Sequence, residues 1–147
     1  MPITGPAPLG EISHVIQLAI APVFLLTAVA ALLGVLTNRL GRAVDRRRVL
    51  VARRPGLEPT VCTLVDAELD FLERRARLIY AAIFLAVLCA LLICLLIALA
   101  FVDAFVVYDF SKLVALLFVL AMLALIGSLS CFLREIFLGV NTARCPI

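Results

Sequence analysis

The protein is 147 residues long, and 65% of them are hydrophobic, with a mean hydropathy of +1.22. A soluble domain is only about half apolar, so this composition excludes one and indicates a single integral membrane domain over residues 1–147. The formal net charge of +3 comes mainly from arginines in one segment. This clustered charge therefore indicates how the chain is oriented in the membrane rather than a nucleic-acid partner.

The first apolar run covers residues 12–37. It predicts a helix that is long enough to cross a bilayer, for which about 20 residues suffice. The preceding stretch is rich in proline and has no basic residue. Because a cleaved signal peptide begins with a basic region, we expect this run to be a membrane span with an extended tail before it.

Residues 38–77 contain ten arginines, which by the positive-inside rule places this segment in the cytoplasm. Two prolines and a glycine at 53–59 predict a break in the helix, with Thr60 as the N-cap of the next one. Beyond it, apolar residues recur every three or four positions. We therefore predict a cytoplasmic helical hairpin that extends the first two spans. The arginines expected to contact lipid phosphates there are Arg46, Arg47, Arg48, Arg53 and Arg54.

Two further apolar runs, 78–102 and 113–133, contain no charged residue and are each long enough to span a membrane. The predicted fold is therefore all-α, with three transmembrane helices. Three spans place the termini on opposite sides, with the amino terminus outside and the carboxyl terminus in the cytoplasm. The connection after the second span lies outside and holds Asp103 and Asp109.

Polar residues are concentrated at the outer end of the first helix. The candidate ion-pathway residues are Glu11, Ser13, His14, Gln17, Pro22 and Thr27. Polar groups at this depth need protein or water as partners because lipid offers none, and Pro22 frees a helix carbonyl. One interpretation is the mouth of a water-filled pathway. The other is an interfacial set of groups that bonds headgroups and neighbouring helices.

A stripe of small residues runs along one face of the same helix at alternating steps of three and four. Its members are Thr27, Ala30, Gly34, Thr37 and Gly41. Since helices associate in lipid largely by close packing over small side chains, the stripe predicts a helix contact. The partner is either another span of the same chain or, if the stripe forms a subunit interface or pore lining, a second copy.

The sequence contains few of the residue patterns that catalysis, metal binding or cofactor binding requires. The five cysteines have no zinc-ligand spacing and His14 is the only histidine, so we expect no metal and no cofactor. No Ser-His-Asp set or glycine-rich phosphate loop is present, and the chain is not expected to be an enzyme. The spans contain no acid or lysine of the kind that carriers use for proton coupling.

Four segments carry a resemblance to a known family: ISHVIQLAIAPVFLL, VLTNRL, RRARLI and LREIFL. The chain resembles small bacterial three-span membrane proteins of formerly unknown function, over about residues 12–138. The resemblance implies a homotrimeric, sodium-selective channel in the bacterial cytoplasmic (inner) membrane.

The leading hypothesis is therefore a homo-oligomeric cation channel whose first helix lines the axis. Its expected partners are further copies of itself, monovalent cations and membrane lipids. Glu11, Asp103 and Asp109 would make the outer vestibule negative and concentrate cations. The alternative is a non-conducting structural or accessory membrane protein that binds lipid or a partner protein.

Overall fold

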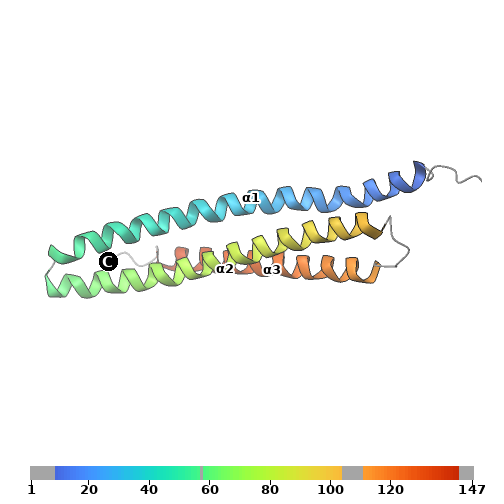
Figure 1. Ribbon diagram of the computed structural model, residues 1–147. Coiled ribbons are helices and arrows are strands. Elements are labelled where there is room, and N and C mark those ends of the chain that lie inside the picture. Colours follow the sequence, from blue (N-terminus) through green and yellow to red (C-terminus); the bar gives the residue numbers. More distant parts are fainter. Residues whose placement is uncertain (1–8, 57, 104–110, 143–147) are drawn as a thin grey trace, which may run out of the picture.

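A computed structural model of the chain describes residues 9–56, 58–103 and 111–142. These residues form three long helices, α1 (Leu9–Arg53), α2 (Pro59–Asp103) and α3 (Ser111–Thr142), and a short 3-10 turn, η1 (Arg54–Gly56) (Figure 1). The predicted all-α class is confirmed. Each helix includes a segment that is long and apolar enough to cross a membrane, and the protein is a multi-pass membrane protein.

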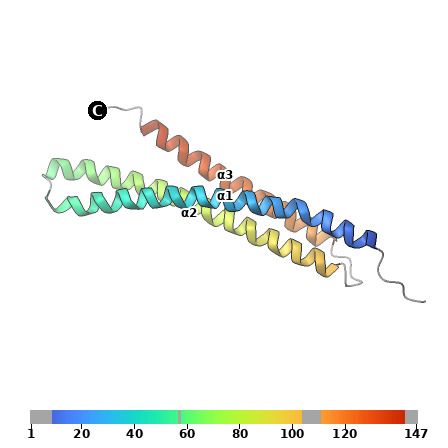
Figure 2. The same ribbon diagram turned by 90° about the horizontal axis from the view of Figure 1, so that it is seen from above.

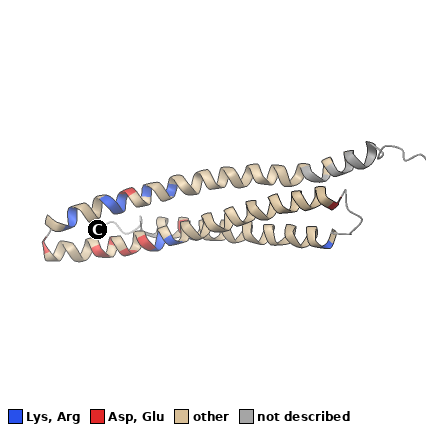
Figure 3. Cartoon of the chain, viewed as in Figure 1, with Lys and Arg blue, Asp and Glu red and all other residues tan. Residues whose placement is uncertain are grey.

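The first two helices are much longer than a bilayer is thick. Each has 45 residues, which at 1.5 Å per residue is about 68 Å, against roughly 30 Å for a hydrocarbon core. They run antiparallel and meet at η1 (Figure 1). Charged side chains gather toward that end, whereas the middle of the molecule is apolar (Figure 3).

The connection between α1 and α2 is tighter than the sequence predicts. Arg53 is still helical, residues 54–56 form the 3-10 turn, and α2 begins at Pro59. The prediction that Thr60 is the N-cap is therefore wrong. The carbonyl oxygen of Glu58 accepts hydrogen bonds from the amides of Val61 (2.9 Å) and Cys62 (3.0 Å). A proline is well suited to the first helical position because its missing N–H would have no helical partner there.

All three helices contribute to a narrow core of mostly small and medium side chains. One cluster comprises Val29, Ala86, Cys89, Ile93, Ala121 and Ala124, and a second comprises Leu36, Ile79 and Ala82. Small residues let helix backbones approach closely in lipid. The approach of α3 to α2 is fixed further by the buried Ser128 hydroxyl, which donates a hydrogen bond to the carbonyl oxygen of Ala82 (2.8 Å).

Large apolar side chains cover the outside of the bundle. Phe24 is 72% exposed, Phe84 68% and Leu91 62%, and one comes from the membrane-spanning part of α1 and two from that of α2. In water such a surface would be costly. In a bilayer it is the expected lipid-facing surface, so only the inward faces of the helices need specific packing.

Ala81 and Ala82 provide a matched test of this packing. Ala82 is fully buried and Ala81 is exposed. We expect Ala82→Leu to overpack the α2–α3 contact and lower the free energy of unfolding by about 1–3 kcal/mol. Ala81→Leu faces lipid and is expected to change it by less than about 0.5 kcal/mol. Thermal unfolding in detergent measures both; equal effects would show that the two faces are wrongly assigned.

Candidate functional site

Helix α1 has two faces with different environments. Pro22, Val29, Leu36 and Leu50 are buried and recur at multiples of seven residues. A second seven-residue series, Ser13, Ile20, Thr27, Gly34 and Gly41, is exposed throughout. Residues seven apart lie on the same face of a bundled helix. One face of α1 therefore packs on the rest of the chain, and another face has no partner among the residues that the structure describes.

The stripe of small residues lies on the unpartnered face. Thr27, Ala30, Gly34, Thr37 and Gly41 are all exposed. A Cβ atom added at Gly34 or Gly41 would meet no atom within 4 Å. Packing of the stripe against α2 or α3, which the sequence left open, is therefore not what the structure shows. The fold of one chain does not require these residues to be small.

Two threonine hydroxyls on this face bond back to their own helix. Thr27 Oγ1 donates to the carbonyl oxygen of Val23 (3.3 Å). Thr37 Oγ1 lies 2.8 Å from the carbonyl oxygen of Leu33 and 3.1 Å from that of Gly34. A hydroxyl that donates its proton to the helix still has lone pairs to accept a bond. Both threonines therefore present oxygen acceptors on an apolar span.

The predicted ion-pathway residues do not all lie together. Ser13 and Gln17 are exposed, as is Thr27, whereas Pro22 is buried on the opposite face. A pathway along the outer face of α1 would include the first three and not the proline ring. The side chains of Glu11 and His14 lie outside the described residues, and so does Asp109.

The structure also reveals a buried charge cluster, which we call the Glu135 cluster. Glu135 of α3 is completely buried. Its Oε2 accepts a hydrogen bond from Nη1 of Arg39 in α1 at 2.6 Å, and its Oε1 accepts one from Nε of Arg75 in α2 at 3.1 Å. Arg75 Nη2 also contacts Oε1. One carboxylate thus joins all three helices.

Aromatic rings and a glycine frame the Glu135 cluster. The guanidinium carbon of Arg39 lies 5.3 Å from the centre of the Phe132 ring, and that of Arg75 lies 5.9 Å from the centre of the Phe71 ring. These are cation–π distances. A Cβ atom at Gly139 would lie 3.5 Å from Nη2 of Arg75, so a small residue there leaves room for the guanidinium.

The predicted third span ends at residue 133, directly before Arg134 and Glu135, and Glu135 is not among the predicted site residues. A carboxylate at the end of an apolar run, with arginines at the ends of both other spans, is a sequence signal for such a cluster. The arginines predicted to contact lipid phosphates lie elsewhere, in the hairpin. Of these, Arg46 binds Glu68 (2.8 Å) and Arg54 binds Asp66 (2.9 Å), and all four side chains are at least 40% exposed. Such pairs contribute about 0–1 kcal/mol each.

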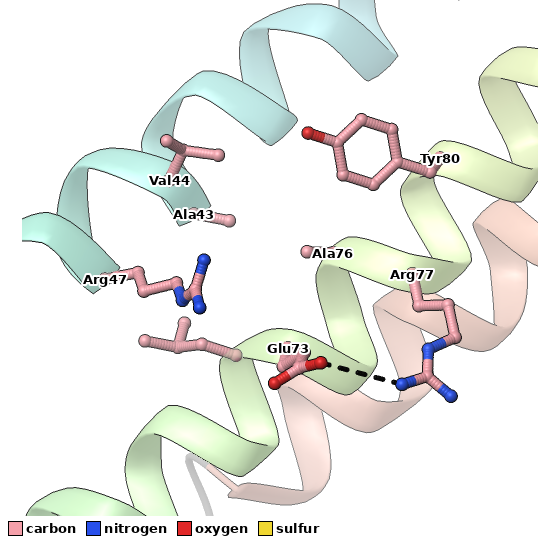
Figure 4. A pocket seen from close by; sticks show the side chains of 8 residues that line it. Ala43, Val44, Arg47, Glu73, Ala76, Arg77 and Tyr80 are labelled. Atoms are coloured by element: carbon pink, nitrogen blue, oxygen red, sulfur yellow. Dashed lines mark ion pairs between the residues drawn. The ribbon is translucent and has the colours of Figure 1, made fainter.

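A cleft of about 310 Å³ separates α1 and α2 near the arginine-rich end. Figure 4 shows Arg47 of α1 and Tyr80 of α2 directed into it from opposite sides. Its one acid, Glu73, pairs with Arg77 at 3.6 Å. Two arginines against one occupied carboxylate make the cleft positive, so it is not a cation site. No group of three or more His, Cys, Asp and Glu side chains that could hold a metal occurs within the described ranges.

Comparison with known proteins gives one match. The family described as "Protein of unknown function (DUF2721)" matches residues 19–145. The chain belongs to this family. No curated protein and no solved structure matches it. The DUF2721 region includes the small-residue stripe and all three members of the Glu135 cluster. It begins after Ser13, His14 and Gln17.

In this DUF2721 protein, the Glu135 cluster can be tested against a surface pair. Glu135→Gln removes the one anion that two arginines share, and loss of one partner from a buried ion pair is strongly destabilising. The two arginine side chains are 31% and 27% exposed and can partly rehydrate. We therefore expect the free energy of unfolding to fall by at least about 2 kcal/mol, measured by thermal unfolding in detergent.

Glu68→Gln is the matched control, because it removes the same charge from the exposed pair with Arg46. Its expected cost is about 0–1 kcal/mol. If both variants lose equal stability, the burial of Glu135 has no special structural role.

Proposed function

We propose that this protein is a homo-oligomeric cation channel in which the unpartnered face of α1 lines the shared axis. The observation that carries the proposal is the exposed seven-residue series on α1, with Ser13, Thr27, Gly34 and Gly41 among its members. A span that faced only lipid would not require glycine and hydroxyl groups along one stripe. In the proposed channel this stripe contacts a neighbouring copy and water.

Several copies are required by geometry. Within one chain, α1 packs its other face on α2 and α3, through residues such as Val29 and Leu36. The exposed face points away from this core, so one chain encloses no axis. A ring of copies about an axis normal to the membrane closes the assembly. The family resemblance implies that the ring has three copies and that the ion is sodium.

The chemistry of this face suits a monovalent cation. Ser13, Gln17 and Thr27 supply neutral oxygen ligands, which hard cations prefer. Thr27 already donates its proton to Val23, so its oxygen is available as an acceptor. Near the outer end, His14 joins Ser13 and Gln17 at the proposed constriction. Glu11, Asp103 and Asp109 form the proposed vestibule, whose negative charge would raise the local cation concentration.

We propose an orientation with the η1 end in the cytoplasm and the amino terminus outside, in the bacterial inner membrane. The charged end of α1 and α2 (Figure 3) then forms a cytoplasmic helical hairpin that extends the first two spans. Arg46, Arg47, Arg48, Arg53 and Arg54 lie on this part and are all exposed. They would hold the hairpin against anionic lipid, following the positive-inside rule.

Cation flux into liposomes tests conduction. We expect reconstituted protein to pass Na⁺, and Gln17→Leu to change the rate or the Na⁺/K⁺ ratio several-fold while the oligomer stays intact, because the amide oxygen is replaced by an apolar group. Val35→Leu is the control, since Val35 is half exposed and apolar on the same helix. Absence of flux from an intact oligomer would favour the alternative, a non-conducting accessory protein. Unaltered flux in Gln17→Leu would show that Gln17 does not line the pathway.

Gly34→Leu tests the interface. The new side chain meets nothing within the chain, and leucine favours helix over glycine by roughly 0.5–1 kcal/mol, so the monomer should fold normally. We expect the oligomer to dissociate at least tenfold more readily, as measured by mass photometry or crosslinking in detergent. Val35→Leu again serves as the control. An unchanged oligomer would show that the stripe is not the contact between copies.

A further inference from the structure

A second basic recess lies between α2 and α3 and shares Arg77 with the first. We call it the α2–α3 groove. It has a volume of about 480 Å³. Its lining residues are Arg74, Arg77, Leu78, Arg134, Phe137 and Leu138. Toward its carboxyl end α3 diverges from the other two helices (Figure 2), and these long side chains border the space between α2 and α3.

The groove carries positive charge that acids in the described part of the chain do not fully neutralise. Neither Arg74 nor Arg134 has a carboxylate within 4.0 Å among the described residues, although Asp70 lies one turn before Arg74. Arg77 contacts Glu73 at 3.6 Å, with both side chains more than half exposed. Three arginines against one acid leave a surplus of about two positive charges.

The neighbouring carboxylate, Glu135, does not pair with the arginines of the groove. Glu135 follows Arg134 in sequence, yet it is buried and points to Arg39 and Arg75. At this helix turn the side chain of Glu135 therefore points inward and that of Arg134 points outward. Because both oxygens of Glu135 are occupied, this acid does not neutralise the guanidinium of Arg134.

Apolar side chains line the groove beside these bases. Leu78 begins the second predicted span, and Arg134 follows directly after the third, so the groove lies at the boundary of the membrane. Phe137 is 65% exposed and Leu138 40%, within about one turn of Arg134. A ligand that fits has a phosphate for the arginines and hydrocarbon for the apolar wall.

We propose that the α2–α3 groove binds the phosphodiester headgroup of an anionic phospholipid. Arg74 and Arg134, one from each helix, are its principal ligands, since guanidinium groups bind phosphate through paired N–H donors. Basic pockets between spans are known to suit such headgroups. The site includes none of the five arginines proposed to hold the hairpin against lipid, and it rests on neither conduction nor oligomer number. A bound lipid would bridge α2 and α3 where they diverge.

Delipidated full-length protein in neutral detergent tests this. We expect phosphatidylglycerol to raise the unfolding temperature in a saturable way, and phosphatidylcholine or inorganic phosphate at equal concentration to have little effect. Arg74→Gln with Arg134→Gln should weaken the apparent affinity for phosphatidylglycerol about tenfold or more, because each charged hydrogen bond lost is worth roughly a factor of ten. Arg42→Gln with Lys112→Gln removes equal charge at two exposed positions that belong neither to the groove nor to the proposed lipid contacts of the hairpin, and should retain the affinity.

Three results would overturn the proposal. Equal stabilisation by phosphatidylcholine would show that the headgroup charge is not recognised, and equal stabilisation by inorganic phosphate would make the ligand a free anion. Equal losses in the two double variants would indicate diffuse charge without a site. If the Arg74/Arg134 glutamine variant does not fold, the double variant Arg74→Lys with Arg134→Lys is tested by counting bound lipids with native mass spectrometry. Lysine keeps the charge but loses the paired N–H donors, so we expect a weaker phosphatidylglycerol adduct. An unchanged adduct would refute the proposed guanidinium–phosphate contact.

Discussion

The arrangement of the three helices depends on one carboxylate. Glu135 has no contact with solvent, and its two oxygens are taken by Arg39 and Arg75, so each helix supplies one member of the Glu135 cluster. An unpaired carboxylate in an apolar interior would cost several kcal/mol. The three helices must therefore meet in one register for the charge to be tolerated. The apolar clusters alone are less selective, because leucine and alanine can slide past one another with little change in buried area.

This fixed register determines which surfaces remain free. With Arg39 turned toward α3 and Leu36 buried beside it, the opposite face of α1 is exposed at every member of the series from Ser13 to Gly41. That face carries Thr27, Gly34 and Gly41, and it is the surface on which the proposed channel depends. Likewise, Glu135 is fully used by Arg39 and Arg75, so Arg134, on the far side of the same turn, has no carboxylate within 4.0 Å in the described part of the chain. The proposed lipid groove is thus a consequence of the same ion cluster.

The packing in the membrane-spanning part is of a different kind from the packing at the charged end. Between the spans, contact is made mostly by small and medium side chains and by one serine hydroxyl, which allow close approach. Toward η1, Arg46 of α1 binds Glu68 of α2, and Arg54 of η1 binds Asp66 of α2. Lipid supplies little hydrophobic drive between helices, so small residues are needed there. Beyond the membrane, water weakens each ion pair to about 0–1 kcal/mol, and these pairs set alignment more than stability.

The sequence by itself determined the three long apolar helices, the break near residue 55 and the stripe of small residues, because length, hydrophobicity and helical periodicity are local properties of a chain. It left open whether the stripe packs inward, since spacing says which residues share a face and not where that face points. It carried a signal at Glu135, a carboxylate at the end of an apolar run, but it did not show which groups that carboxylate binds. Its partners Arg39 and Arg75 lie 96 and 60 residues away in sequence, and only the tertiary structure, which brings the ends of three helices together, decided that this carboxylate is buried and which arginines it binds.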